Sequence, residues 1–368
     1  KIAFGSKGAR EVLKLRNYGI ALQWMVLTPS FLFMAALAST VLGASSFARK
    51  MGKTLLVGTT IDEASKNIVS SLLATDLWSR MTGGSSEGIY IAKNKPNIYL
   101  WMQDESLLRL DNVHRTFSDT TGLDHSSFSE VIFLSKHAAA SGIPSLTVHP
   151  IGVPWLKQSD CERYGGIGGR ASPPSNRIGS LYRSLLKETV ARQLDDTFQV
   201  TLEATHHGPF CELPTCFVEI GSCVKTWDNP KAGSCWTAVL DNELGLSDVD
   251  VDVAEGNAPT NECVLILIGG GHYVPKMNDA LRLGKGIHAG HMLATYTLSQ
   301  FFTPAPEAPE GQVSRGSGDD STHAKVETSL EESEESEELE LDKQPSLRKV
   351  LTEAIESTRC AHPEAGQC

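Results

Sequence analysis

The chain lacks several motifs that mark common protein classes. None of its eight cysteines forms a C-x2-C pair, which argues against a zinc ribbon. No G-x-G-x-x-G run follows an expected strand and no Walker lysine motif is present, so neither a dinucleotide site nor a P-loop is indicated. The N-x-[ST] sequon is also missing. Together with cysteines that lie in apolar, strand-like runs, this favours free thiols in a reducing compartment.

The chain has little net charge outside one acidic stretch. Residues 307–342 hold 13 Asp or Glu against Arg315 and Lys325, a local net charge of −11, which equals the net charge of the whole chain. The remainder is about neutral, so the total does not exclude a polyanionic partner, because a neutral domain can carry a local basic groove. Residues 303–345 are rich in Pro, Ser and Glu, with too little apolar surface to offset ordering entropy, and we expect an acidic disordered linker.

The first 50 residues look unlike a domain. Residues 19–44 are apolar, carry no charge and follow a basic stretch, the pattern of a signal anchor or one membrane span. A removed targeting peptide, translated upstream sequence before Met51, and a buried core helix are the other interpretations. We expect residues 1–50 to lie outside the catalytic fold, with membrane contact only if 19–44 is an anchor. A cytoplasmic location is favoured, and organelle targeting or anchoring is the alternative.

Residues 51–302 form the expected folded domain. Short apolar runs rich in Val, Ile and Phe are typical of strands covered on both faces. Helix-like stretches lie between some of them, which predicts an α/β fold with a mixed, mostly parallel sheet. The expected strands are 54–58, 88–92, 98–102, 131–134, 145–148, 198–202, 216–220 and 263–268, and the expected helices are 62–78, 177–193 and 229–246.

The last segment, 346–368, contains one more helical pattern. Apolar residues between Leu347 and Ile355 recur at helical spacing and predict a short amphipathic helix over 345–359. A helix docked on the domain and a marginal, solvated helix both remain open.

Two adjacent histidines stand in the stretch TLEATHHGPF, residues 201–210. If the chain is extended there, Glu203 and His207 point to one face and His206 to the other. We therefore expect one histidine to share a site with Glu203 while its neighbour supports another layer. The spacing differs from H-E-x-x-H, so a zinc ion would need a third ligand from elsewhere.

Two further histidines follow expected strands directly. His137 comes after 131–134 and His149 after 145–148. Ligands of open α/β sheets bind at the carboxyl ends of strands, so two histidines at equivalent ends favour a site over isolated structural imidazoles. Lys136 is either a phosphate ligand or a solvated side chain.

A buried carboxylate and a glycine run complete the candidates. Glu219 lies within an apolar strand, where it needs a cation, a metal or hydrogen-bond donors. Gly269, Gly270 and Gly271 end another strand, and their N–H groups could line an anion or oxyanion pocket next to His272. Beyond them, His288 and His291 share one face if that segment is helical.

Several of these motifs, in this order, resemble the D-aminoacyl-tRNA deacylases of the archaeal and plant type. They are LSKHAAASGIPSLTVHPIG, TLEATHHGP, FVEIGS with Trp227 beyond it, GGGHY-x-P, and the Gly-His pair at 290–291. The resemblance covers about 53–300, so 51–302 becomes the expected catalytic domain. It implies a phosphorylase/hydrolase-like three-layer α/β/α fold and hydrolysis of the ester between a D-amino acid and tRNA. For the plant branch, it implies clearance of aldehyde-modified aminoacyl-tRNA as well.

The resemblance also implies two zinc ions per subunit, without assigned ligands, a tRNA substrate and no stable protein partner. Two rival interpretations stay open, namely a metal-dependent hydrolase of small acyl or peptide substrates and a non-enzymatic tRNA-binding module. The candidate catalytic residues are Glu203, His206, His207 and His272; the candidate substrate-binding residues are Lys136, His137, His149, Glu219, Gly269, Gly270 and Gly271; the candidate metal ligands are Glu203, His206, His207, Glu219, His272 and His291.

Overall fold

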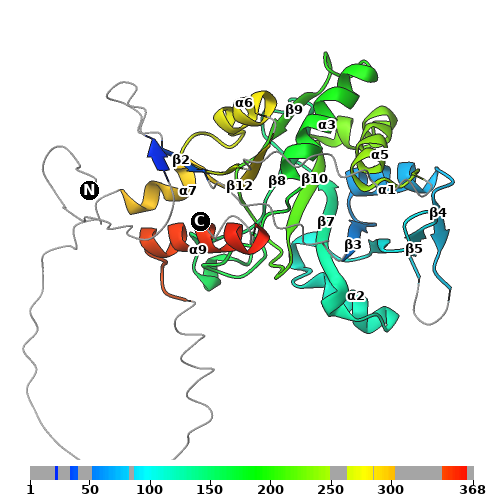
Figure 1. Cartoon of the computed structure of the whole chain (residues 1–368), viewed down its shortest axis with the longest axis horizontal. Helices are drawn as coiled ribbons and strands as arrows, with labels where there is room; N and C mark the ends of the chain where they lie inside the picture. The colour runs from blue at the N-terminus through cyan, green and yellow to red at the C-terminus, as the bar shows by residue number, and fades with distance from the viewer. Residues whose placement is uncertain are drawn as a thin grey trace, which may run out of the picture.

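The computed structural model contains a large mixed sheet, a smaller second sheet, and helices packed on both (Figure 1). It describes residues 21–23, 34–39, 52–82, 87–248, 263–284, 286–302 and 342–362. The linker expected at 303–345 and the apolar segment expected at 19–44 lie largely outside these residues.

The large sheet has eight strands in the order β4-β5-β6-β3-β7-β10-β8-β9. Strands β6, β3, β7 and β10 are parallel to one another, and β8 is parallel to β9. The pair β10–β8 is antiparallel, as are β4–β5 and β5–β6. The prediction of a mixed, mostly parallel sheet is therefore confirmed. The strands are β3 (Lys53–Thr59), β4 (Trp78–Arg80), β5 (Ile89–Ala92), β6 (Ile98–Gln103), β7 (Phe128–Lys136), β8 (Ser145–His149), β9 (Gln199–Leu202) and β10 (Thr215–Gly221).

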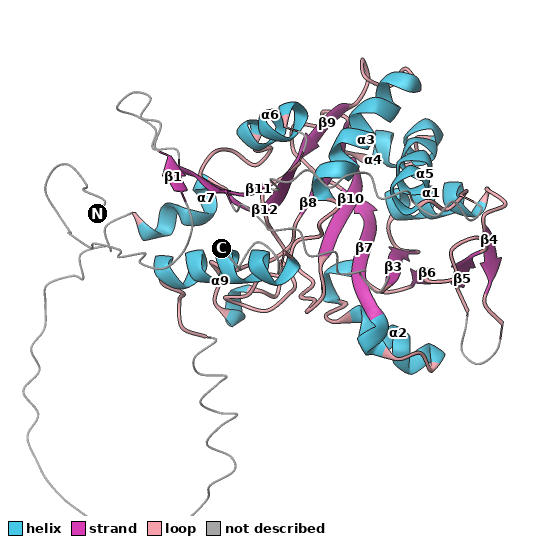
Figure 2. Ribbon diagram, in the orientation of Figure 1, coloured by secondary structure: helices cyan, strands magenta, loops and turns pink. Residues whose placement is uncertain are grey.

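Helices cover both faces of this sheet because its strands are apolar on both sides (Figure 2). Leu56 and Ile132 face one hydrophobic cluster, which includes residues of α1 (Glu63–Leu73), α3 (Ile178–Ala191) and α5 (Pro230–Leu244). Their neighbours in sequence, such as Val57 and Phe133, face the opposite cluster with α2 (Val113–Thr121). The alternation explains the three layers, and the three-layer fold that the resemblance implied is confirmed.

The predicted helix starts are formed by side-chain caps. Asp62 accepts a hydrogen bond from Ser65 N at 3.0 Å and caps α1. Asn229 accepts from Lys231 N at 3.0 Å, and Pro230 occupies the first turn of α5, where its missing N–H costs nothing. These local signals explain why both helices begin where the sequence indicates.

A second sheet, in the order β1-β2-β11-β12, lies beside the first. Its strands are β1 (Ala21–Gln23), β2 (Met34–Ser39), β11 (Cys263–Ile268) and β12 (Ile287–Leu293), and α6 (Pro275–Leu283) joins the last two. The backbone of β2 pairs with β11, and the placement of 1–50 outside the catalytic fold stays a prediction. Segment 287–293 is the strand β12, so the condition under which His288 and His291 share a helical face is not met. In this strand, Gly290 lies so close to helix α9 (Leu347–Ala361) that an added Cβ would sit 2.7 Å from Thr358 Cγ2.

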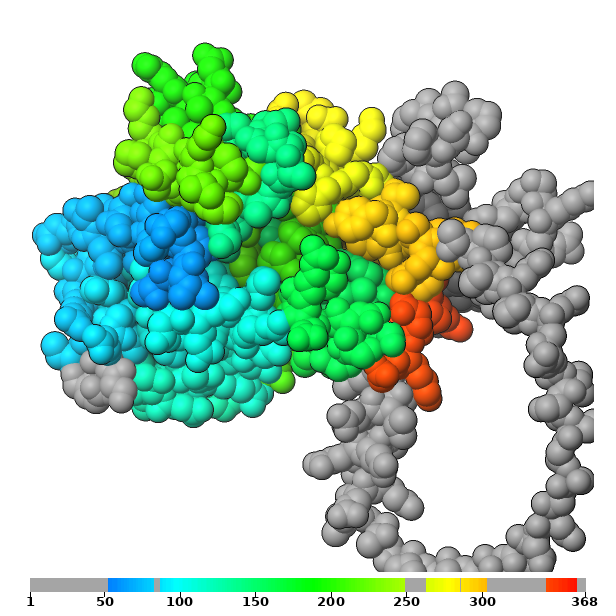
Figure 3. All heavy atoms as spheres, turned by 180° about the vertical axis from the view of Figure 1, so that it is seen from behind, coloured from blue at the N-terminus to red at the C-terminus, as the bar shows by residue number. Residues whose placement is uncertain are grey.

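The C-terminal amphipathic pattern forms helix α9 (Leu347–Ala361), which is docked. Val350 and Ala354 are buried in a cluster with Trp155, Leu293 and Leu298. Figure 3 shows the red surface of α9 against the green and orange surface of the domain. Short helices α4 (Val224–Trp227) and α7 (Thr295–Leu298) complete the elements used below. Within the described residues, no helix has the length and apolarity needed to cross a membrane.

Candidate active site

Strand β10 places Glu219 between two histidines. In the sheet register Glu219 lies opposite Ser135 of β7 and Thr147 of β8. Its Oε2 is 3.8 Å from His137 Nδ1 and 3.6 Å from His149 Nε2. The expectation of equivalent strand ends is wrong, because β8 runs antiparallel to β10. The two histidines nevertheless belong to one cluster, because both contact Glu219 Oε2.

Glu203 is the centre of the second half of the cluster. It follows β9 directly and is fully buried. His272 Nε2 donates to its Oε2 at 2.8 Å, and His137 Nδ1 lies 3.1 Å from its Oε1 as an ion pair. His206 Nε2 lies 3.6 Å from the same Oε2. One buried carboxylate therefore connects three histidines that come from different loops.

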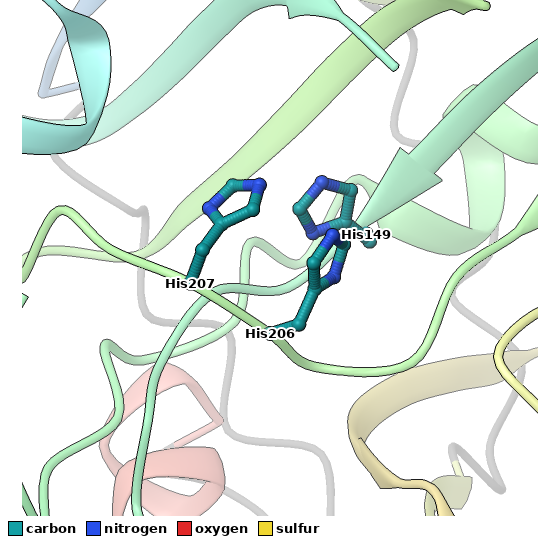
Figure 4. Close-up of side chains that lie close together, drawn as sticks. All are labelled: His149, His206 and His207. Atoms are coloured by element: carbon teal, nitrogen blue, oxygen red, sulfur yellow. The ribbon is translucent and has the colours of Figure 1, made fainter. Parts of the chain in front are cut away.

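The adjacent histidines both belong to the cluster. We expected them on opposite faces, but β9 ends at Leu202 and the chain is no longer a strand beyond it. Ala204 N donates to His272 O and Thr205 N to Met292 O, so the segment is held by strand β12 of the second sheet and by the loop after β11. His207 adopts a left-handed φ of 42°. Both imidazoles consequently lie beside His149, with ring centroids 4.2 and 4.9 Å away (Figure 4).

Backbone carbonyls set the tautomers of these three histidines. Nδ1 donates to Pro150 O in His149, to Ala204 O in His206 and to Gly208 O in His207, at 3.0, 2.8 and 2.6 Å. In the neutral rings, Nε2 then carries the lone pair. Burial lowers the pKa of His149 to about 4 and that of His207 to about 3, and burial followed by the nearby imidazoles holds the pKa of His206 well below its usual value.

This arrangement fits a zinc ion. Ligand atoms of His149, His206 and His207 lie within 4.8 Å of one another. The rings are neutral, their Nδ1 atoms are anchored as in many zinc sites, and the buried Nε2 of His149 has no hydrogen-bond partner. Two other groups of three, His137–Glu203–His272 and His149–Glu203–Glu219, meet the same distance limit. The donor set therefore suits the metal that the sequence resemblance implies.

The pKa values of the two carboxyl groups are shifted in opposite directions. Burial opposes ionisation of Glu203, but hydrogen bonds from His137 and His272 hold its pKa well below the usual value. Burial raises the pKa of Glu219 well above its usual value, and the charge of Glu203 raises it further. Burial disfavours protonation of His137 and His272, yet their hydrogen bonds to Glu203 outweigh it and raise the pKa of both. Such separation of two carboxyl groups is typical of acid–base sites.

Other predicted residues lie at the edge of the cluster or outside it. Lys136 is exposed, with its ammonium 5.2 Å from the ring centre of Trp227. His291 is buried and shares a hydrogen bond with Thr205 Oγ1 at 3.0 Å, outside the three ligand groups. Gly269 and Gly270 have the positive φ that glycine permits, 103° and 86°. Gly269 N donates to Leu293 O and is thus committed to the fold, while Gly271 is exposed.

Three contacting residues were absent from the predicted set. Thr147 donates to Glu219 Oε2 at 3.3 Å, and its place two residues before His149 on one strand was the signal for it. Tyr273 Oη shares a hydrogen bond with His137 Nε2 at 2.9 Å. Tyr296 Oη does so with His272 Nδ1 at 3.1 Å. The cluster is open towards this last side, since the side chains of His206 and His272 are 20% and 31% exposed.

Known proteins share this chain's sequence and fold. A family model described as D-aminoacyl-tRNA deacylase matches residues 124–359. A D-aminoacyl-tRNA deacylase of Arabidopsis thaliana is 40% identical over 248 residues, 67% of this chain and 75% of the relative. One from Methanothrix thermoacetophila is 29% identical over 68% of this chain and 80% of its own. A crystal structure of a conserved protein of unknown function has the same fold, with a TM-score of 0.53 and 24% identity over 67% of this chain and 78% of that one.

Proposed function

Because this chain belongs to the D-aminoacyl-tRNA deacylase family, we propose that it hydrolyses the ester bond of D-aminoacyl-tRNA and releases the free D-amino acid and tRNA. The observation that carries the mechanism is the cluster itself, in which the buried carboxyl groups of Glu203 and Glu219 lie within 3.8 Å of four imidazoles, those of His137, His149, His206 and His272. An aminoacyl ester is already activated, so its hydrolysis needs an oriented water and stabilisation of the developing oxyanion.

Glu203 is the proposed base. His137 and His272 lower the pKa of this carboxyl group, and a water held against it would give up its proton to the carboxylate that they keep in place. His272 is also partly exposed, so it lies where the substrate enters. Glu219 lies between His137 and His149, which favours a role in positioning these two imidazoles, and it stays a candidate partner for the substrate ammonium or a metal.

Zinc is proposed to bind His149, His206 and His207. When bound, it would lower the pKa of a coordinated water and polarise the ester carbonyl. The chain itself contributes the three neutral imidazoles and the backbone carbonyls that orient them. Glu203, 3.6 Å from His206 Nε2, provides the adjacent negative charge.

Residues around the cluster are proposed to contact the tRNA. Gly270 and Gly271 stay candidates for contacts to the terminal ribose, and exposed Lys136 for a phosphate. The catalytic unit is proposed to be 51–302 together with docked helix α9. Six cysteines of the described residues are free thiols, which supports the cytoplasmic location expected from the sequence; they are Cys161, Cys211, Cys216, Cys223, Cys235 and Cys360.

The test is release of amino acid from matched D- and L-tyrosyl-tRNA by the purified full chain. We expect turnover of the D-form, sparing of the L-form, and loss of turnover in Glu203→Gln. Equal rates on both enantiomers, or no release from the D-form, would overturn the proposal. The rival function, hydrolysis of small acyl or peptide substrates without tRNA, would instead show in comparable rates on such substrates.

A further inference from the structure

Two half-exposed tyrosines stand at the open side of the cluster. Tyr296, on α7, is 52% exposed although its Oη is hydrogen-bonded to His272. His272 in turn donates to Glu203. The phenol end of Tyr296 is thus fixed two hydrogen bonds from the proposed base, while its ring remains accessible to a ligand.

Tyr164 is held close by from a different loop. Its backbone carbonyl accepts from Gly208 N at 2.8 Å, directly after His207 in sequence. The turn at Gly165 and Gly166 uses φ of 69° and 76°, and a Cβ on Gly165 would lie 1.9 Å from Leu108 O. This tight backbone fixes the position of Tyr164, which is 41% exposed. Both tyrosines therefore border the histidine cluster, Tyr164 through its contact beside His207 and Tyr296 through His272.

A cation accompanies the aromatic pair. The guanidinium carbon of exposed Arg163 lies 5.8 Å from the ring centre of Tyr164. Single-stranded nucleic acid is commonly bound by exposed aromatic rings with a cation beside them. Bases stack on the rings and the cation attracts phosphate.

We propose that Tyr164 and Tyr296 form an aromatic subsite, with Arg163 beside it, that stacks the terminal base of the tRNA acceptor end. The inference rests on the proposed function, since the scissile ester is attached to the ribose of that terminal nucleotide. A base stacked at the rim places the ester, one sugar away, next to Glu203. The subsite thereby selects the nucleic-acid part of the substrate and leaves the amino-acid part to the buried cluster.

Steady-state kinetics on D-tyrosyl-tRNA test the proposal. Tyr164→Ala is expected to raise KM by about 5- to 100-fold, the range for loss of one base–aromatic stack, with little change in kcat. Tyr164→Phe should retain the wild-type KM. Tyr296→Phe keeps the ring but loses the contact to His272, so kcat should fall more than KM rises. Val190→Ala, at an exposed position on α3, is the matched control with both constants unchanged.

A substrate lacking only the terminal base separates stacking from other causes. Wild-type enzyme should lose about the same factor on D-tyrosyl-tRNA with an abasic terminal nucleotide as Tyr164→Ala loses on the normal substrate. The variant should lose little more, because the two changes remove one interaction. An unchanged KM in Tyr164→Ala, or an undiminished effect on the abasic substrate, would overturn the subsite.

The amino-acid side chain provides a second discrimination. Tyr164→Ala should lose the same factor on D-alanyl-tRNA as on D-tyrosyl-tRNA; a loss confined to the tyrosyl substrate would show that the rings hold the amino acid and would overturn the proposal. Wild-type enzyme without turnover of either D-substrate would sink the proposed function itself, an outcome distinct from the others. A thermal unfolding midpoint equal to that of the wild type shows that each variant is correctly folded.

Discussion

Replacing Glu203 by glutamine separates the chemistry of the site from its stability. The substitution keeps the shape of a fully buried side chain and removes its negative charge. If Glu203 takes the proton of the attacking water, kcat should fall by about 10²- to 10⁴-fold, the usual contribution of general base catalysis. KM should change much less, because the group contacts the water rather than the tRNA.

The expected change in unfolding free energy is small, as opposing contributions nearly cancel. Glutamine weakens the charge-assisted hydrogen bond from His272 at 2.8 Å, worth about 1.5–3 kcal/mol, and removes the ion pair with His137 at 3.1 Å. Removing the buried charge recovers a desolvation cost of several kcal/mol. The variant should therefore be about as stable as the wild type, or more stable, as is common when a functional charge is removed.

Glu130→Gln is the matched control. Glu130 is also buried in the main sheet, at the start of β7, where Arg177 Nε donates to it at 2.8 Å and Ser175 Oγ donates as well. It should lose about 1–3 kcal/mol of stability with unchanged kcat. Rapid-quench deacylation and urea unfolding of both variants give the comparison. If Glu203→Gln kept kcat within threefold of wild type, or lost activity only by unfolding, the reasoning would be refuted.

Three further outcomes follow from the packing and the ligand set. His149→Ala should retain less zinc than wild type after dialysis against a weak chelator, as measured by elemental analysis, and equal retention would contradict the three-histidine assignment. Val350→Asp, at a fully buried position of α9, should lower unfolding free energy by more than about 3 kcal/mol in urea titration, and an unchanged midpoint would mean that α9 does not pack on the domain. Gly208→Ala, whose Cβ would lie 2.2 Å from Gly166 N, should reduce kcat by displacing the His207 loop, whereas wild-type kcat would show that the two loops are uncoupled.

Most of the fold was predictable because its signals are local. Apolar runs and caps such as Asp62 and Pro230 are properties of a few neighbouring residues, and they correctly placed the main strands and helices. The strand at 287–293 was not among the predicted strands, because its histidine spacing suits a helix. Its strand form depends on pairing with β11 and on the close approach of α9 at Gly290, and both partners are distant in sequence.

The sequence predicted which residues form the candidate site but not how they are arranged in space. Buried polar side chains in apolar surroundings identified Glu203, Glu219 and the histidines around them. The direction of β8 carries no periodic signature, because a strand has the same alternation whichever way it runs. The orientation of His206 and His207 depends on where β9 ends, which the second sheet decides through its hydrogen bonds to residues 204–205.

Charge assignment required the same long-range information. Glu203 and Glu219 are the same residue type, yet the pKa of the first is lowered and that of the second is raised. The difference arises because His137 and His272 both contact Glu203 closely, whereas the hydrogen bond to Glu219 comes from the neutral hydroxyl of Thr147. Their mutual repulsion then amplifies the difference, since the first carboxylate to ionise disfavours ionisation of the second. The role proposed for Glu203 as the base thus follows from its neighbours rather than from the residue type.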